Sequence, residues 1–231
     1  MLFEHPHTLL DRVGKVLGRV GPEKFFSSSE QEVKKAQEGF FAYFFTLVLK
    51  KHYHGRDWWI YHPNQSERKY PDFDFVSFGD DIKDLKLEPV ELTGVYPHFK
   101  SFEEALSVVK NKQKKYGDKL LNFSLLVFVN HEKSEEWINQ LRSSIMSEKP
   151  FLSIWAIHLR FKIGGKEVDE VVAQKIMPLP YLRIETKIDD SEIHKPQGLP
   201  RYFEVKKDGE NTYITLKASV FDEIKKTLNN N

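Results

Sequence analysis

The chain of 231 residues contains no cysteine. This absence excludes disulfide bonds, thiolate metal sites and cysteine nucleophiles, and it is compatible with a reducing compartment. The N-terminus lacks the cationic segment followed by an apolar segment that marks a secretory signal. The longest apolar run, Phe40 to Leu49, is about half as long as a membrane span requires. We therefore expect a cytoplasmic protein that does not enter a membrane.

A strong net charge is also absent, because 35 basic and 34 acidic side chains give a formal net charge of +1. No global basic field therefore indicates a nucleic-acid partner, and such a partner would need a local face of lysine or arginine. One face of a predicted helix is rich in lysine, namely Lys110, Lys112, Lys114, Lys115 and Lys119. Contacts from these residues to phosphates would give salt-sensitive binding that does not depend on sequence. A charge run of this kind is also typical of a helix face that is only solvated.

Aromatic residues are abundant, with 18 Phe, 9 Tyr and 4 Trp, so the chain can bury a sizeable core. After an amphipathic segment within residues 1–26, the periodicity of apolar residues predicts a series of helices and strands. The helices are expected at about 29–52, 102–116 and 134–147, and the strands at 57–61, 73–78, 87–95, 122–130 and 151–162. The run at 122–130 is continuously apolar, which favours a central strand buried on both faces. The order predicts an α/β fold with a mixed central sheet flanked by helices.

The pattern changes after Gly164 and Gly165. Short strands are expected within residues 177–188 and 201–216, the latter a hairpin turned by Asp208 and Gly209, and a last helix at 220–228. We therefore divide the chain into an α/β core with an N-terminal helical segment, residues 1–165, and a C-terminal β-rich extension, residues 166–231. The extension is expected to pack on the same body.

Two acidic residues stand out between Tyr70 and Val95. Asp72 lies at the start of the first predicted strand of this stretch, and Glu91 lies in the middle of the second. Two carboxylates on neighbouring strands in a dry setting are suited to hold a hard divalent cation such as Mg²⁺. Asp74 shares a strand face with Asp72, because side chains alternate with a period of two. Asp74 is therefore a rival metal ligand, or else a solvated edge residue.

Together, the αβββαβ order, the pair Pro71-Asp72 and the segment Val90 to Thr93 resemble the PD-(D/E)XK nuclease superfamily, which has the restriction-endonuclease-like fold. The resemblance covers roughly residues 27–131. It implies that Asp72 and Glu91 bind Mg²⁺ or Mn²⁺, and that the protein is an endonuclease or exonuclease acting on DNA. The oligomeric state stays open, a homodimer included.

The sequence departs from the superfamily pattern at Thr93, which stands where a lysine is expected. Threonine can hydrogen-bond a water molecule but supplies no positive charge. Lys112 is a candidate replacement, because it aligns with Val109 and Tyr116 on the apolar face of the helix at 102–116. The spacing of Lys112 and Tyr116 is similar to a Gln-x-x-x-Tyr element of exonuclease-like members. Alternatively, Lys112 extends from the edge of this face to solvent.

A further acid, Glu30, points along the apolar face of the helix at 29–52, while Glu32 and Glu38 point away when each residue turns the helix by about 100°. Glu30 is therefore either an accessory acid of the site or a helix cap, since an acidic first turn suits the helix dipole.

Two literal Glu-x-Lys triplets, Glu185 to Lys187 and Glu204 to Lys206, lack the preceding Pro-Asp strand and the following helix, and we interpret them as coincidental. Thr93 also supports a different hypothesis, a catalytically inactive nuclease-fold protein that binds nucleic acid or another protein. In a third hypothesis the αβββαβ interpretation is wrong and the acids are ordinary surface residues.

Overall fold

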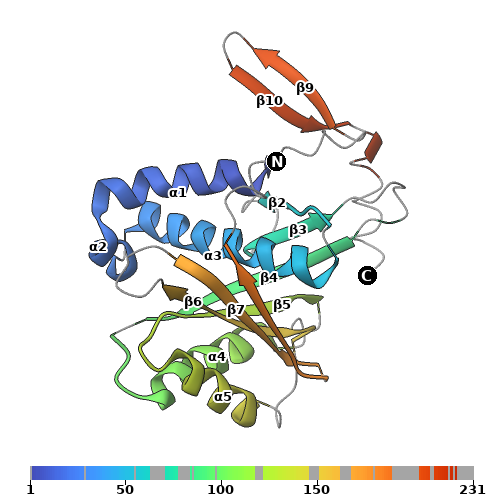
Figure 1. Ribbon diagram of the computed structural model, residues 1–231. Coiled ribbons are helices and arrows are strands. Elements are labelled where there is room, and N and C mark those ends of the chain that lie inside the picture. The colour runs from blue at the N-terminus through green and yellow to red at the C-terminus, as the bar shows by residue number, and fades with distance from the viewer. Residues whose placement is uncertain are drawn as a thin grey trace.

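The computed structural model describes residues 2–28, 30–54, 56–62, 71–77, 84, 86–96, 98–117, 122–145, 151–161, 168–178, 180–188, 203–208, 211–217, 219–220 and 222. These residues form an α/β protein in which N-terminal helices precede a mixed sheet with interspersed helices (Figure 1). The predicted fold class is therefore confirmed at this level.

The helices and strands follow one another in a simple order. They are β1 (Leu2–Glu4), α1 (Pro6–Val20), α2 (Pro22–Ser27), α3 (Gln31–His52), β2 (Trp59–His62), β3 (Phe73–Ser77), β4 (Lys86–Val95), α4 (Phe102–Tyr116), β5 (Ser124–Val129), α5 (Ser134–Ile145), β6 (Ile154–Phe161), β7 (Val168–Met177), β8 (Leu182–Lys187), β9 (Phe203–Asp208) and β10 (Asn211–Leu216).

The central sheet contains β2 to β8 in chain order, and the three-residue strand β1 pairs with the outer edge of β2. Strands β2, β3 and β4 form an antiparallel meander. Strands β4, β5 and β6 are parallel, with α4 and α5 as the connections between them, and β7 and β8 return antiparallel. Every residue of β5 is buried, which confirms the predicted central strand.

The described part of the chain after residue 165 first continues the central sheet. Strands β7 and β8 extend the central sheet, and β7 was not predicted as a strand. Strands β9 and β10 form the predicted hairpin, which is a separate sheet and projects from the body of the molecule (Figure 1). The predicted helix at 220–228 lies almost entirely outside the described residues.

Helices cover both faces of the sheet, with α1 and α3 on one side and α4 and α5 on the other (Figure 1). Val90 and Leu92 of β4 belong to the core beneath α3, whereas Val95 belongs to the core beneath α4. Because side chains alternate along a strand, Glu91 is directed toward α4. In the described part of the chain, no helix has the length and apolar content needed to cross a membrane.

Helix α3 lies between α1 and the sheet, and its buried residues are distributed around most of its circumference. The close approach of α1 depends on Gly39, because a Cβ atom there would lie 2.8 Å from Cδ1 of Leu9. Because α3 is covered by α1 as well as by the sheet, its apolar residues are not confined to one face.

Candidate active site

The two predicted metal-binding carboxylates lie on adjacent strands. In the antiparallel ladder of β3 and β4, Phe73 is opposite Val90, so the next pair outward is Asp72 and Glu91. Oδ2 of Asp72 accepts a hydrogen bond of 2.7 Å from the backbone N–H of Leu92. The side chain of Glu91 is only 2% exposed. One carboxylate is thus fixed by the backbone of β4, and the other is buried beside it.

Helix α4 is positioned to face this pair. The hydroxyl of Ser101 caps the helix by accepting a 3.4 Å hydrogen bond from the backbone N–H of Glu104. Ala105 and Val109 are fully buried in the core beneath the helix. The face of α4 that carries Ala105 and Val109 therefore packs against the sheet.

Lys112 and Tyr116 lie on that side of α4, four residues apart, and both reach Glu91. Nζ of Lys112 donates a hydrogen bond to Oε1 of Glu91 in an ion pair. The hydroxyl of Tyr116 donates to the same oxygen at 2.5 Å. The side chain of Lys112 is 24% exposed, so the pair is shielded from solvent. Lys112 does not extend to solvent, and that alternative is wrong.

The second carboxylate oxygen of Glu91, Oε2, is buried and has no hydrogen-bond partner among the described residues. A buried polar atom of this kind is costly unless it is paired, and it needs an explanation. Carboxylate oxygens are the ligands that Mg²⁺ and Mn²⁺ prefer, and Mg²⁺ retains several waters when one or two carboxylates bind it. Asp72 and Glu91 therefore fit such an ion. The described residues include no group of three or more His, Asp or Glu side chains arranged to hold a metal.

A third carboxylate, Glu38 of α3, is electrostatically coupled to the same cluster. Burial raises the pKa of Glu38 to about 7, with a further contribution from the negative charge of Asp72. The charge of Glu91 acts in the same direction, while Lys112 opposes it. Burial also raises the pKa of Asp72, as does the charge of Glu91, against the lowering effect of Lys112. The three acids thus repel one another at one end of a largely buried cluster.

Tyr96 closes the side of the cluster next to α3. Its hydroxyl donates a 3.3 Å hydrogen bond to Oε1 of Gln37, and burial together with the charge of Glu38 raises the pKa of Tyr96 to about 12. The Tyr96 ring lies across Gly94, where a Cβ atom would be 2.6 Å from Cζ of the ring. Gly94 therefore allows the aromatic ring to lie against β4 beside Glu38.

Glu30 is not part of this cluster. It is exposed at the N-cap position of α3, makes no capping hydrogen bond with its side chain, and forms an ion pair of 3.0 Å with Lys24. Glu38 is the acid of α3 whose pKa responds to the charges of Asp72 and Glu91, although the helical periodicity predicted that it points away. That prediction is wrong because α3 is buried on most sides and has no single inward face.

Thr93 and Asp74 are the other candidate residues on these strands. Thr93 is half-buried on the same face of β4 as Glu91, two residues further along. Asp74 is fully buried opposite Pro89, so its interpretation as a solvated edge residue is wrong. The assignment of Asp74 as a metal ligand stays a prediction.

The predicted lysine face of α4 is divided. Nζ of Lys115 donates a 2.7 Å hydrogen bond to the hydroxyl of Tyr116, so Lys115 joins Lys112 at the cluster. Lys110 and Lys114 are exposed, and Lys119 lies outside the described residues. The sequence did not predict the contact between Lys115 and Tyr116, because residues adjacent in sequence point in different directions from a helix.

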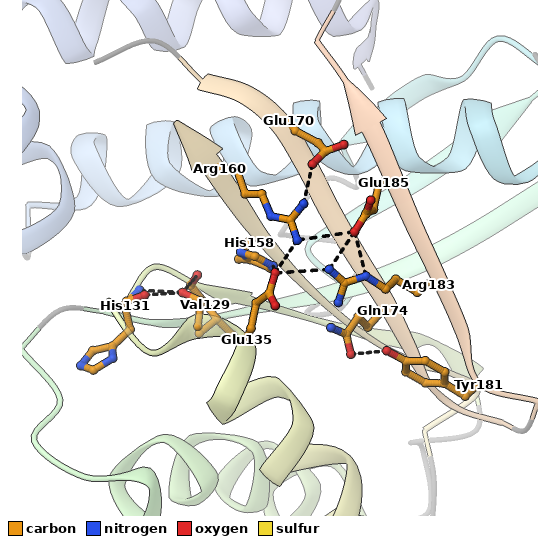
Figure 2. A network of polar contacts seen from close by, with 11 residues as sticks. Val129, His131, Glu135, His158, Arg160, Glu170, Gln174, Tyr181, Arg183 and Glu185 are labelled. Atoms are coloured by element: carbon orange, nitrogen blue, oxygen red, sulfur yellow. Dashed lines mark hydrogen bonds and ion pairs between the residues drawn. The ribbon is translucent and has the colours of Figure 1, made fainter. Parts of the chain in front are cut away.

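A second polar cluster lies on β6, β7 and β8 opposite the start of α5 (Figure 2). It contains Glu135, His158, Arg160, Glu170, Arg183 and Glu185. Arg160 binds Glu170 at 2.8 Å, and both Arg160 and Arg183 bind Glu135, at 2.5 and 3.2 Å. Each carboxylate has a guanidinium partner, and the network connects β6 and β8 to α5 through Glu135.

This network includes one of the two Glu-x-Lys triplets. Glu185 accepts from Arg183 at 2.7 Å, which engages its carboxylate. The other triplet, Glu204 to Lys206, lies in the β9–β10 hairpin. Neither triplet belongs to the cluster around Glu91.

Comparisons of the chain with protein-family models, with curated proteins and with solved structures gave no match. Any function assigned to the chain therefore rests on the geometry of the cluster around Glu91.

Proposed function

We propose that the protein is a metal-dependent nuclease that hydrolyses phosphodiester bonds of DNA. In this proposal α3, β2, β3, β4, α4 and β5 form a restriction-endonuclease-like αβββαβ core. The observation that carries the proposal is a pair of carboxylates on adjacent strands, the half-buried Asp72 and the buried Glu91. Oε1 of Glu91 accepts from Lys112, and Oε2 has no partner among the described residues.

Asp72 and Glu91 would hold Mg²⁺ or Mn²⁺, which when bound stabilises charge on a phosphate and lowers the pKa of a coordinated water. Lys112 and Tyr116 fix the Glu91 carboxylate through Oε1, so that Oε2 has a defined position. Lys112 also supplies the positive charge that Thr93 lacks, and this charge compensates the buried Glu91 carboxylate. Glu38, whose pKa of about 7 is matched to neutral pH, can accept a proton at its carboxylate.

The test is cleavage of plasmid and single-stranded DNA with Mg²⁺ or Mn²⁺. We expect metal-dependent cleavage by the wild-type protein and its loss in a double variant, Asp72→Asn with Glu91→Gln, which preserves side-chain size. Glu185→Gln is the matched control, because Glu185 belongs to the second cluster, and it should retain activity. Equal cleavage by the double variant and the control would refute the site assignment.

A second function is favoured by one observation, the ammonium group of Lys112 bound directly to Glu91 in a chain that has Thr93 at the usual lysine position. A permanently neutralised Glu91 would give an inactive nuclease-fold module that binds nucleic acid or protein. Calorimetry with Mn²⁺ separates the two proposals. Heat of binding that disappears in the double variant supports the nuclease, and its absence in the wild-type protein supports the inactive module.

A further inference from the structure

We infer that Lys115 binds a phosphate group of the nucleic-acid substrate, and that the exposed ammonium of Lys115, held by the Tyr116 hydroxyl, marks where the substrate strand enters the site. This inference rests on the proposed nuclease function. The two lysines that contact the cluster then have different roles. Lys112 neutralises Glu91, and Lys115 attracts the substrate.

The cluster needs a cation on its solvent side. Glu38, Asp72 and Glu91 carry the negative charges, and a phosphodiester that approaches them is repelled at short range. Lys112 cannot easily serve the substrate, because its ammonium is already paired with the buried Glu91 carboxylate. Withdrawing it would leave that carboxylate buried without a counter-charge, which is strongly unfavourable.

Lys115 meets the requirement. Its side chain is exposed, and its Nζ lies 2.7 Å from the Tyr116 hydroxyl and 4.6 Å from the centre of the Tyr116 ring. Within the described residues Lys115 forms no ion pair with a carboxylate, although its charge lowers the pKa of Asp72. An ammonium group has three N–H donors, and the contact with Tyr116 uses one of them. Two donors therefore serve an incoming phosphate.

Tyr116 connects this ammonium to the buried acid. Its hydroxyl accepts from Lys115 and donates to Oε1 of Glu91 at 2.5 Å, so one hydroxyl group separates the exposed cation from the carboxylate. The tyrosine side chain is 7% exposed and is held in the core beneath α4. A phosphate bound by Lys115 would thus lie beside the cluster, at a distance set by a rigid aromatic side chain.

The first experiment measures binding of a fluorescein-labelled single-stranded DNA 12-mer in EDTA. The variants are Lys115→Gln, Lys115→Arg and Lys114→Gln, where Lys114 is the exposed neighbour on α4. We expect Lys115→Gln to weaken binding about tenfold. The slope of log K against log salt concentration, which is negative, should become less steep by about 0.7, as expected when a protein loses one phosphate contact with a single strand. Lys115→Arg should bind like the wild type, and Lys114→Gln should change binding less than about twofold.

The second experiment measures steady-state cleavage of the same DNA with Mn²⁺. We expect Lys115→Gln to raise KM with little change in kcat. Equal binding by Lys115→Gln and Lys114→Gln would overturn the inference, as would a lower kcat at unchanged KM, which would mean that Lys115 acts only through Tyr116. A wild-type protein that binds the DNA but does not cleave it contradicts the proposed nuclease, while the binding comparison in EDTA still decides the role of Lys115.

Discussion

At the scale of single residues, the ion pair of Glu91 and Lys112 is the main determinant of the candidate site. Glu91 is almost completely buried, and Lys112 is its only cationic partner within the described residues. Removing one member of a buried pair costs more than removing both, because the other charge stays buried and unpaired. We therefore expect Lys112→Met to lower the free energy of unfolding by about 3 kcal/mol.

The matched variant adds Glu91→Gln to Lys112→Met. The neutral amide no longer needs a counter-charge, so the double variant should regain most of the lost stability. Urea denaturation followed by tryptophan fluorescence measures both variants. A double variant no more stable than Lys112→Met would show that the packing of the lysine stem, and not its charge, supports Glu91.

The periodicity of strands and helices was sufficient to predict that Glu91 and Lys112 lie close together. The period of two along β4 and the helical phase of α4 bring Glu91 and Lys112 to the same interface. Periodicity failed for Glu38 and Glu30, because the phase of a helix is informative only when one of its faces is exposed. Helix α3 is covered by both α1 and the sheet, so its apolar pattern does not single out the direction of the site.

At the scale of elements, the packing of α1 on α3 depends on Gly39. A Cβ atom at this position would lie 2.8 Å from Cδ1 of Leu9 and 3.1 Å from Cγ2 of Val13, both fully buried. Gly39→Ala should therefore push the helices apart and lower the free energy of unfolding by about 1–3 kcal/mol. Chemical denaturation measures this change.

Gly14 of α1 provides the control, because a Cβ atom there meets nothing within 4 Å. Gly14→Ala should stabilise the protein by up to about 1 kcal/mol through helix propensity alone. If Gly39→Ala is as favourable as Gly14→Ala, the close contact between α1 and α3 does not limit stability.

Strand β7 shows why part of the sheet escaped prediction. Its sequence mixes apolar residues with Glu170, Gln174 and Lys175, which obscures the strand pattern. In the structure, Glu170 binds Arg160 of β6, and Gln174 accepts from the hydroxyl of Tyr181 at 2.5 Å. Glu170 and the amide oxygen of Gln174 thus have partners on other segments, and a linear pattern does not reveal such partners.

At the scale of the whole molecule, stability should depend on pH through buried groups with shifted pKa values. Glu38 titrates at about 7 when folded and near 4.5 when unfolded, so the unfolded chain loses this proton first and stability falls as pH rises from about 4.5 to about 7. Burial lowers the pKa of His158 to about 4, against the opposing charge of Glu135. The unfolded chain therefore binds this proton first, and stability falls as pH decreases from about 6.5 to about 4.

Each variant isolates its group by difference from the wild type. Relative to the wild type, Glu38→Gln should gain stability as pH rises from about 4.5 to about 7, and His158→Gln should gain stability as pH falls from about 6.5 to about 4. Urea denaturation at several pH values between 4 and 8 provides the comparison. A constant difference between variant and wild type over the relevant range would mean that the group has the same pKa in both states.

The chain order of the sheet has a consequence for how the protein is made. Each strand from β2 to β8 pairs with the one before it, so each can join the growing edge as it leaves the ribosome. Every side chain of the candidate site lies between Glu38 and Tyr116, and the site is therefore synthesised before β5 to β8. Until β6 arrives, the fully buried strand β5 presents an open edge, which is the kind of edge that favours aggregation. Strand β6 thus covers the open edge of β5, the strand that pairs with β4 of the candidate site, although β6 contributes none of the site side chains named above.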